Sequence, residues 1–140
     1  MKFIFLLFIS LISSSLSFAY DLDTLAELIQ KGKESEAIQR ANQYIQKYPN
    51  DPELKFIYAA LLDHFGKTRE SKDAFLDLSN KYPNNAVIKN NLGVIYTKLG
   101  QYSNARIYFE SALRLKSDYQ EAKNNLQHIS KLDRVYFTSK

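Results

Sequence analysis

Residues that could take part in catalysis or bind a metal are few in this sequence. The chain contains no cysteine and two histidines, His64 and His128. Neither histidine belongs to a His-x-x-x-His or Glu-x-x-His pattern, the spacings that bring two metal ligands onto one face of a helix. Asp63 precedes His64 directly, so on a helix their side chains point in different directions, and the sequence has neither a glycine-rich phosphate loop nor a G-x-S-x-G elbow. We therefore predict no catalytic, cofactor-binding or metal-binding residues, and we expect a protein that is not an enzyme.

Composition and charge describe an ordinary globular chain. Hydrophobic residues make up 45% and charged residues 24% of the 140 residues, which suits one domain with its own core. The formal net charge is +4, but basic and acidic residues alternate along the segment from Lys67 to Asp73, as is typical of solvent-exposed helix faces. The absence of a basic stripe argues against nucleic-acid binding, and the absence of cysteine excludes a disulfide framework.

Several landmarks recur along the chain with a period of 34 residues. Pro49 and Pro83, each in a Tyr-Pro-Asn turn, are 34 residues apart. The glycines and the small residues that follow them at the same period are Gly32, Gly66 and Gly100, and Ala37, Ser71 and Ala105. Because independent landmarks share one period, we predict an array of repeated units.

The segment 86–119 shows the pattern of one unit most fully. It holds Leu92, Gly93 and Tyr96 in the spacing L-G-x-x-Y, followed by Ala105 and Phe109 in the spacing A-x-x-x-F. This pattern resembles the tetratricopeptide repeat (TPR), a 34-residue helix-turn-helix unit.

The resemblance implies an all-α fold, a short right-handed α-solenoid of three TPR helix pairs plus a C-terminal capping helix. The expected TPR domain covers residues 20–133, with repeats at about 18–51, 52–85 and 86–119, a capping helix at 120–132 and a C-terminal tail at 134–140. Each helix pair buries its apolar faces against its neighbours, so the stacked pairs would share one core. The residues expected to pack the repeats are Gly32, Gly66, Gly93, Gly100, Ala37, Ser71, Ala105, Phe75 and Phe109.

The amino terminus has the features of a secretory signal peptide. Lys2 precedes an apolar run at residues 3–12, and Ser17-Phe18-Ala19 offers small residues at both positions of a cleavage site. The run is about ten residues long, short of the roughly twenty that a membrane-spanning helix needs. We therefore expect residues 1–19 to be removed and the protein to be exported across the inner membrane into the periplasm. The alternative is a membrane anchor formed by an uncleaved segment at residues 3–19.

The resemblance also implies a concave groove lined by the leading helix of each repeat. The positions that line it in the family correspond here to Phe56, Ala60, Asp63, His64, Asn90, Val94, Thr97, Lys98, Asn124, His128 and Lys131. This mixture of an aromatic, small apolar residues, amides and cations suits a short peptide with some acidic character. Some family members grip a C-terminal carboxylate with polar residues of the first repeat, but Leu22 and Ala26 stand at those positions here.

We therefore expect a non-enzymatic, exported interaction module that binds a peptide or protein segment in this groove. Such a module would act as an adaptor in an envelope assembly, secretion or pilus-type system, without a cofactor, metal or nucleic acid as partner. Two alternatives remain open. One is a structural scaffold that self-associates through the exposed edge of its last helix, and the other is a membrane-anchored TPR protein in a membrane-associated complex.

Overall fold

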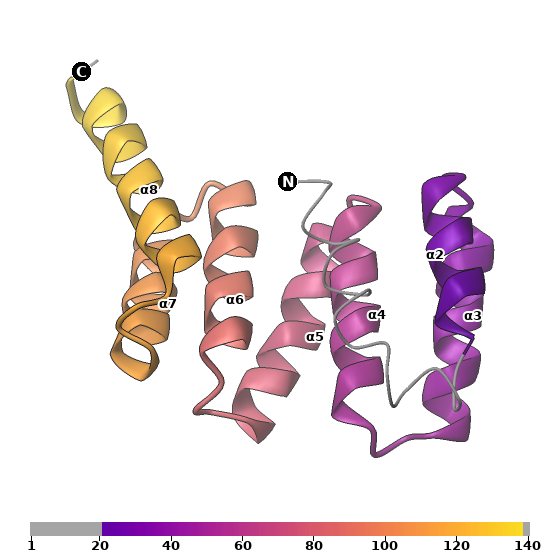
Figure 1. Cartoon of the computed structure of the whole chain (residues 1–140). Helices are drawn as coiled ribbons and strands as arrows, with labels where there is room; N and C mark the ends of the chain where they lie inside the picture. The colour runs from indigo at the N-terminus through magenta and orange to yellow at the C-terminus, as the bar shows by residue number, and fades with distance from the viewer. Residues whose placement is uncertain (1–20, 139–140) are drawn as a thin grey trace. The chain divides into compact units, whose positions relative to one another are not determined.

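The structure, a computed structural model, describes the backbone of residues 21–138 and the side chains of residues 21–132. The predicted signal segment at 1–19 lies outside the described residues. The described part of the chain consists of seven α-helices joined by short turns, with no β-strand (Figure 1). None of these helices is both long enough and apolar enough to cross a membrane.

The chain divides into two compact units, Met1–Lys67 and Thr68–Lys140. The boundary falls inside the predicted second repeat, between its two helices. Each unit is therefore described by itself, and the prediction of one core shared by all repeats stays a prediction.

The first unit holds α2 (Leu22–Gln30), α3 (Glu34–Lys47) and α4 (Pro52–His64). Asp21 and Asp51 begin α2 and α4, because their carboxylates accept hydrogen bonds of 2.8 to 3.2 Å from backbone N–H groups of the first turn. Proline suits the first position of α4, where its missing N–H has no helical partner to lose. The start of α4 at Pro52 coincides with the expected start of the second repeat.

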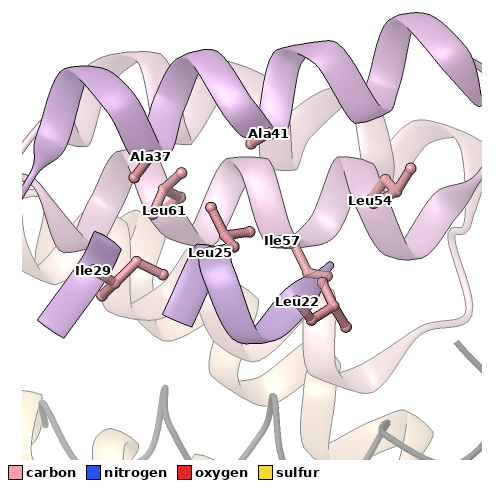
Figure 2. Packing of buried hydrophobic residues seen from close by; sticks show 8 residues of the cluster. All are labelled: Leu22, Leu25, Ile29, Ala37, Ala41, Leu54, Ile57 and Leu61. Atoms are coloured by element: carbon pink, nitrogen blue, oxygen red, sulfur yellow. The ribbon is translucent and has the colours of Figure 1, made fainter. Parts of the chain in front are cut away.

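The core of the first unit lies between its three helices, as Figure 2 shows. Ala37 and Ala41 of α3 are almost fully buried, and their small side chains allow the neighbouring helices to approach closely. The phenol of Tyr44 also donates a hydrogen bond of 3.1 Å to the backbone carbonyl of Asp21, which joins α3 to the start of α2. The side chains that form this core are Leu22, Leu25, Ile29, Ala37, Ala41, Leu54, Ile57 and Leu61.

The second unit holds α5 (Thr68–Lys81), α6 (Ala86–Lys98), α7 (Tyr102–Leu115) and α8 (Gln120–Thr138). Within it α6 packs against α5, α7 and α8, and α7 packs against α8. The amide oxygen of Asn85 accepts hydrogen bonds of 3.0 and 3.1 Å from the first turn of α6 and so begins that helix. The core side chains of this unit include Phe75, Leu78, Ile88, Leu92, Ile95, Ala105, Phe109, Ala112, Ala122 and Ile129.

The last helix is longer than the sequence predicts. α8 continues to Thr138, beyond the expected end at residue 132 and through most of the segment assigned to a tail. The physical reason is that the last glycine is Gly100 and the last proline is Pro83, so no helix-breaking residue follows the start of α8.

The glycines that recur every 34 residues act through their backbone. Gly32, Gly66 and Gly100 have φ angles of 67°, 77° and 71°, in the left-handed region that ends helices and that glycine adopts without strain. A Cβ atom at any of the three would meet nothing within 4 Å. These three residues therefore form the turns, and their predicted role in packing is replaced by this conformational one. Gly93 is the packing glycine, because a Cβ atom there would overlap the ring of Phe109.

Candidate functional site

The residues predicted to line a groove divide between the two units. Phe56, Ala60, Asp63 and His64 lie on α4 in the first unit. Those of the second unit lie on α6 and α8, namely Asn90, Val94, Thr97, Lys98, Asn124, His128 and Lys131. The two sets are described separately, and a single groove across all repeats stays a prediction.

The four residues on α4 are all partly buried. The ring of His64 lies edge-on to that of Phe65, with centroids 5.0 Å apart and an interplanar angle of 80°. Such an arrangement is typical of aromatic packing. Among residues 21–132, no group of three or more histidine, cysteine, aspartate or glutamate side chains could hold a metal ion.

In the second unit a hydrogen bond between two asparagines joins α6 to α8. The amide Nδ2 of Asn125 donates to Oδ1 of Asn90 over 3.1 Å. Asn90 is only 8% exposed and also forms a side-chain hydrogen bond with Tyr119. Although the resemblance placed Asn90 among the groove contacts, the structure buries it between the two helices, where it holds them together.

Tyr119 lies at the start of α8, beside this asparagine pair. Burial raises the pKa of the Tyr119 phenol, the negative charge of Glu121 raises it further, and the hydrogen bond with Asn90 lowers it in part. The phenol therefore stays protonated at physiological pH and remains a neutral member of the α6–α8 contact.

Two further predicted residues contribute mainly to packing. Val94 is partly buried against the core around Phe109 and Ile129. The hydroxyl of Thr97 donates a hydrogen bond of 2.9 Å to the backbone carbonyl of Gly93, one turn earlier in α6. Both side chains keep some exposed surface, so they add a small apolar component beside more polar neighbours.

The remaining four predicted residues are exposed and polar. Lys98 lies at the end of α6, and Asn124, His128 and Lys131 lie along α8. Asn124 accepts a hydrogen bond of 2.9 Å from the amide of Gln120. We call Lys98, Asn124, His128 and Lys131 the α6–α8 polar surface. It offers two ammonium groups, an imidazole and an amide, which can bind carboxylates and backbone carbonyl groups.

A cavity beside α8 was not predicted from the sequence. It has a volume of about 440 Å³ and lies between α7 and α8. Its lining residues are Leu113, Lys123, Leu126, Gln127, Ser130 and Lys131. The one available signal was the prediction of a single capping helix at 120–132 in place of a helix pair. Lys131 thus belongs both to the α6–α8 polar surface and to the rim of this cavity.

A second hollow lies in the first unit and was likewise not predicted from the sequence. Its volume is about 560 Å³, and most of its lining comes from one face of α3. Lys67 borders it and forms an ion pair of 3.1 Å with Glu34. The lining residues are Glu34, Ser35, Ile38, Gln39, Asn42, Gln43, Gln46 and Lys67. Most of these residues carry amide, hydroxyl or charged groups, which offer hydrogen bonds to a ligand.

The fold is shared with solved TPR domains. The first TPR domain of human RPAP3 superposes with a TM-score of 0.72 at 19% identity, covering 84% of this chain and 93% of that one. The first TPR of Spaghetti (RPAP3), solved with the HSP90 peptide SRMEEVD, gives a TM-score of 0.69 at 20% identity, covering 79% of this chain and 87% of that one. The Sgt2 TPR domain from Aspergillus fumigatus gives 0.72 at 15% identity, covering 84% of this chain and 80% of that one. At these identities the likeness shows the fold alone.

The predicted fold class is confirmed by these likenesses and by the all-helical structure. Among curated protein sequences, no relative matches significantly. Residues 22–129 match the family described as the N-terminal TPR repeats region of Psidin. This match covers more than half of the sequence and includes the segment whose residues resemble the repeat. The chain therefore belongs to this tetratricopeptide-repeat family.

Proposed function

We propose that this chain is a non-enzymatic interaction module that binds a peptide or protein segment at the α6–α8 polar surface. The observation that supports the proposal is the geometry of that surface. The Asn90–Asn125 hydrogen bond holds α6 and α8 together, and exposed polar side chains from both helices lie outside this buried pair. A partner would therefore meet a surface that is already organised, which lowers the entropy cost of binding.

The charges of the surface suggest an acidic, extended segment as the ligand. Lys98 and Lys131 attract carboxylates, and Asn124 is able to hydrogen bond to a peptide backbone. The TPR domain of Spaghetti is similar in fold and was solved with a peptide that contains two glutamates and an aspartate. Because the surface is small and polar, we expect modest affinity that decreases as salt is added.

We further propose that the protein is exported and acts as an adaptor in an envelope assembly, secretion or pilus-type system. This part rests on the sequence of residues 1–19, with its short apolar run and the Ser17-Phe18-Ala19 tripeptide. Mass spectrometry of the protein from fractionated cells tests it. The expected result is a chain that begins at Tyr20 in the periplasmic fraction. An intact amino terminus in the membrane fraction would support the anchor at residues 3–19 instead.

The binding proposal is tested with synthetic peptides of one length that differ only in their number of glutamates and aspartates. Fluorescence anisotropy should show affinity that rises with the number of acidic residues. Lys98→Glu should weaken binding of the most acidic peptide roughly fivefold or more, because it replaces attraction by repulsion at an exposed site. His128→Ala should weaken it less.

Arg114→Glu is the matched control, since Arg114 is exposed on α7 and lies outside the α6–α8 polar surface. It makes the same change in net charge as Lys98→Glu. If both reversals weaken binding equally, the peptide responds to overall charge, and the site is not the α6–α8 polar surface. Affinity that does not depend on peptide acidity would contradict the acidic ligand.

A further inference from the structure

The cavity between α7 and α8 lies at the surface of the second unit. Leu113 and Leu126 are partly buried in it, while Lys123, Gln127 and Lys131 are exposed at its rim. The guanidinium group of Arg106 also lies close by, with Nη1 3.5 Å from the Ser130 hydroxyl. We call the six residues that line the cavity the tail edge. It combines a small apolar floor with a basic rim.

The sequence period indicates that a helix could not pack against the tail edge as closely as α7 packs against α6. Residue 127 corresponds to residue 93 after one period of 34, so Gln127 stands where α6 has Gly93. At Gly93 even a Cβ atom would overlap the ring of Phe109. The longer side chain of Gln127 therefore prevents an equally close contact. The tail edge suits a shallower contact between two surfaces.

The opposite charge occurs on α2, in the first unit. Asp23, Ala26, Glu27 and Gln30 recur at the spacing of one helix face. Asp23 is exposed, and the Glu27 side chain is 59% exposed, in an ion pair with Lys31 one turn later. Such an exposed pair is weak enough to exchange partners. We call Asp23, Ala26, Glu27 and Gln30 the head edge.

The two halves of the sequence differ in charge in the same sense. Residues 21–67 contain eight acidic and six basic residues, a net charge of −2. Residues 68–140 contain seven acidic and twelve basic residues, a net charge of +5. Residues 21–67 therefore carry a small net negative charge and residues 68–140 a net positive charge.

We propose that copies of this chain associate head to tail, with the acidic head edge of one copy against the basic tail edge of another. Contact of two tail edges would bring lysines together, and contact of two head edges would bring carboxylates together, so like charges disfavour both symmetric arrangements. The head-to-tail contact brings opposite charges together and covers the apolar floor around Leu113 and Leu126. Because this contact uses different surfaces on the two copies, each copy keeps one unused edge, and assemblies grow with concentration.

The experiment measures the size of the full chain, purified with the amino terminus that the cell leaves on it, by sedimentation velocity. Several loading concentrations are compared at low and at high salt. We expect the mean mass to rise with concentration at low salt and to fall toward the monomer at high salt, where exposed charges are screened.

Charge reversal at each edge gives the decisive comparison. The tail variant carries Lys123→Glu and Gln127→Glu, and the head variant carries Asp23→Lys and Glu27→Lys. Each variant alone should associate at least about tenfold more weakly than the parent, since several favourable pairs become repulsive. An equimolar mixture of the two variants should associate again, because the reversed tail edge of one variant and the reversed head edge of the other carry opposite charges. Circular dichroism confirms that both variants are folded.

The possible outcomes separate this proposal from its alternatives and from the proposed function. A parent that stays monomeric at every concentration and salt overturns it. A parent that self-associates while the two variants mix without restoring association indicates another interface between copies. Lys131 belongs to both the tail edge and the α6–α8 polar surface, whereas the head variant is substituted only on α2. Peptide binding by the head variant therefore tests the proposed function independently.

Discussion

Gly93 of α6 lies directly against the ring of Phe109 of α7, so closely that a Cβ atom on Gly93 would overlap three ring carbons. Both residues are almost fully buried, with Phe109 only 1% exposed. The φ angle of Gly93 is not positive, so the position requires glycine for space and not for backbone conformation. This contact sets how closely the two helices of the pair approach each other.

Replacing Gly93 by leucine should therefore destabilise the protein. The added side chain must displace Phe109 or separate α6 from α7, and overpacking of this kind typically costs about 1 to 3 kcal/mol. Lys98→Ala, at an exposed position of the same helix, should cost about 0.5 kcal/mol or less. Urea denaturation of both variants measures the difference. Equal midpoints would show that the contact is not tight in solution.

Substitution of Gly100 should also destabilise the protein, but for a different reason. Its φ angle of 71° is unfavourable for residues with a Cβ atom, whereas a Cβ atom there would meet nothing within 4 Å. Gly100→Ala should thus lower the free energy of unfolding by about 1 to 2 kcal/mol through backbone strain alone. Ser103→Ala, at an exposed residue in the first turn of α7, serves as the control. A neutral Gly100→Ala variant would mean that the turn relaxes to another conformation.

The hydrogen bond between Asn90 and Asn125 predicts coupled effects on stability. Asn90→Ala should cost about 1 to 3 kcal/mol, because it removes a buried amide and leaves the amide of Asn125 without this acceptor. In a double-mutant cycle with Asn125→Ala, the coupling energy should be about 0.5 to 1.5 kcal/mol. Asn124→Ala, at the adjacent exposed residue, is the control and should change stability little. A coupling energy near zero would argue against the bond in solution.

The raised pKa values of Tyr119 and Tyr108 predict how the free energy of unfolding changes at alkaline pH. Burial raises the pKa of Tyr119. Burial also raises the pKa of Tyr108, and the charge interaction and hydrogen bond with Tyr96 raise it further. A folded-state pKa above the unfolded value of about 10 means that the folded protein holds its proton more tightly. The resulting stabilisation is complete below pH 10 and is lost as the pH rises through the folded-state pKa.

Tyr119→Phe removes one of these groups, so its stability should fall less steeply than that of the parent above pH 10. Denaturation of both proteins at pH 7 and at several values above pH 10 measures this. The difference at pH 7 reports the loss of the hydrogen bond with Asn90, and only its change with pH reports the titration. Parallel curves for the two proteins would contradict the raised pKa.

The sequence alone determined the helical units and most of their ends, the end of α8 at Thr138 being the exception. Asp51 and Pro52 mark the start of α4, and Gly32, Gly66 and Gly100 mark turns after helices, because caps and left-handed glycines depend on only a few neighbouring residues. The 34-residue period, together with the residues at the packing positions of one repeat such as Gly93 and Phe109, predicted the family. These signals are local or strictly periodic, so a single sequence contains them in full.

Only the tertiary structure decided which side chains remain open to a partner. Asn90 occupies a position that lines the groove in the family, yet its contacts with Asn125 and Tyr119 bury it. The cavity around Leu113 and Leu126 likewise arises where α7 and α8 pack against each other. Both outcomes depend on how helices distant in the sequence pack together. Burial and hydrogen bonding between helices are properties of the assembled unit, and no local pattern specifies them.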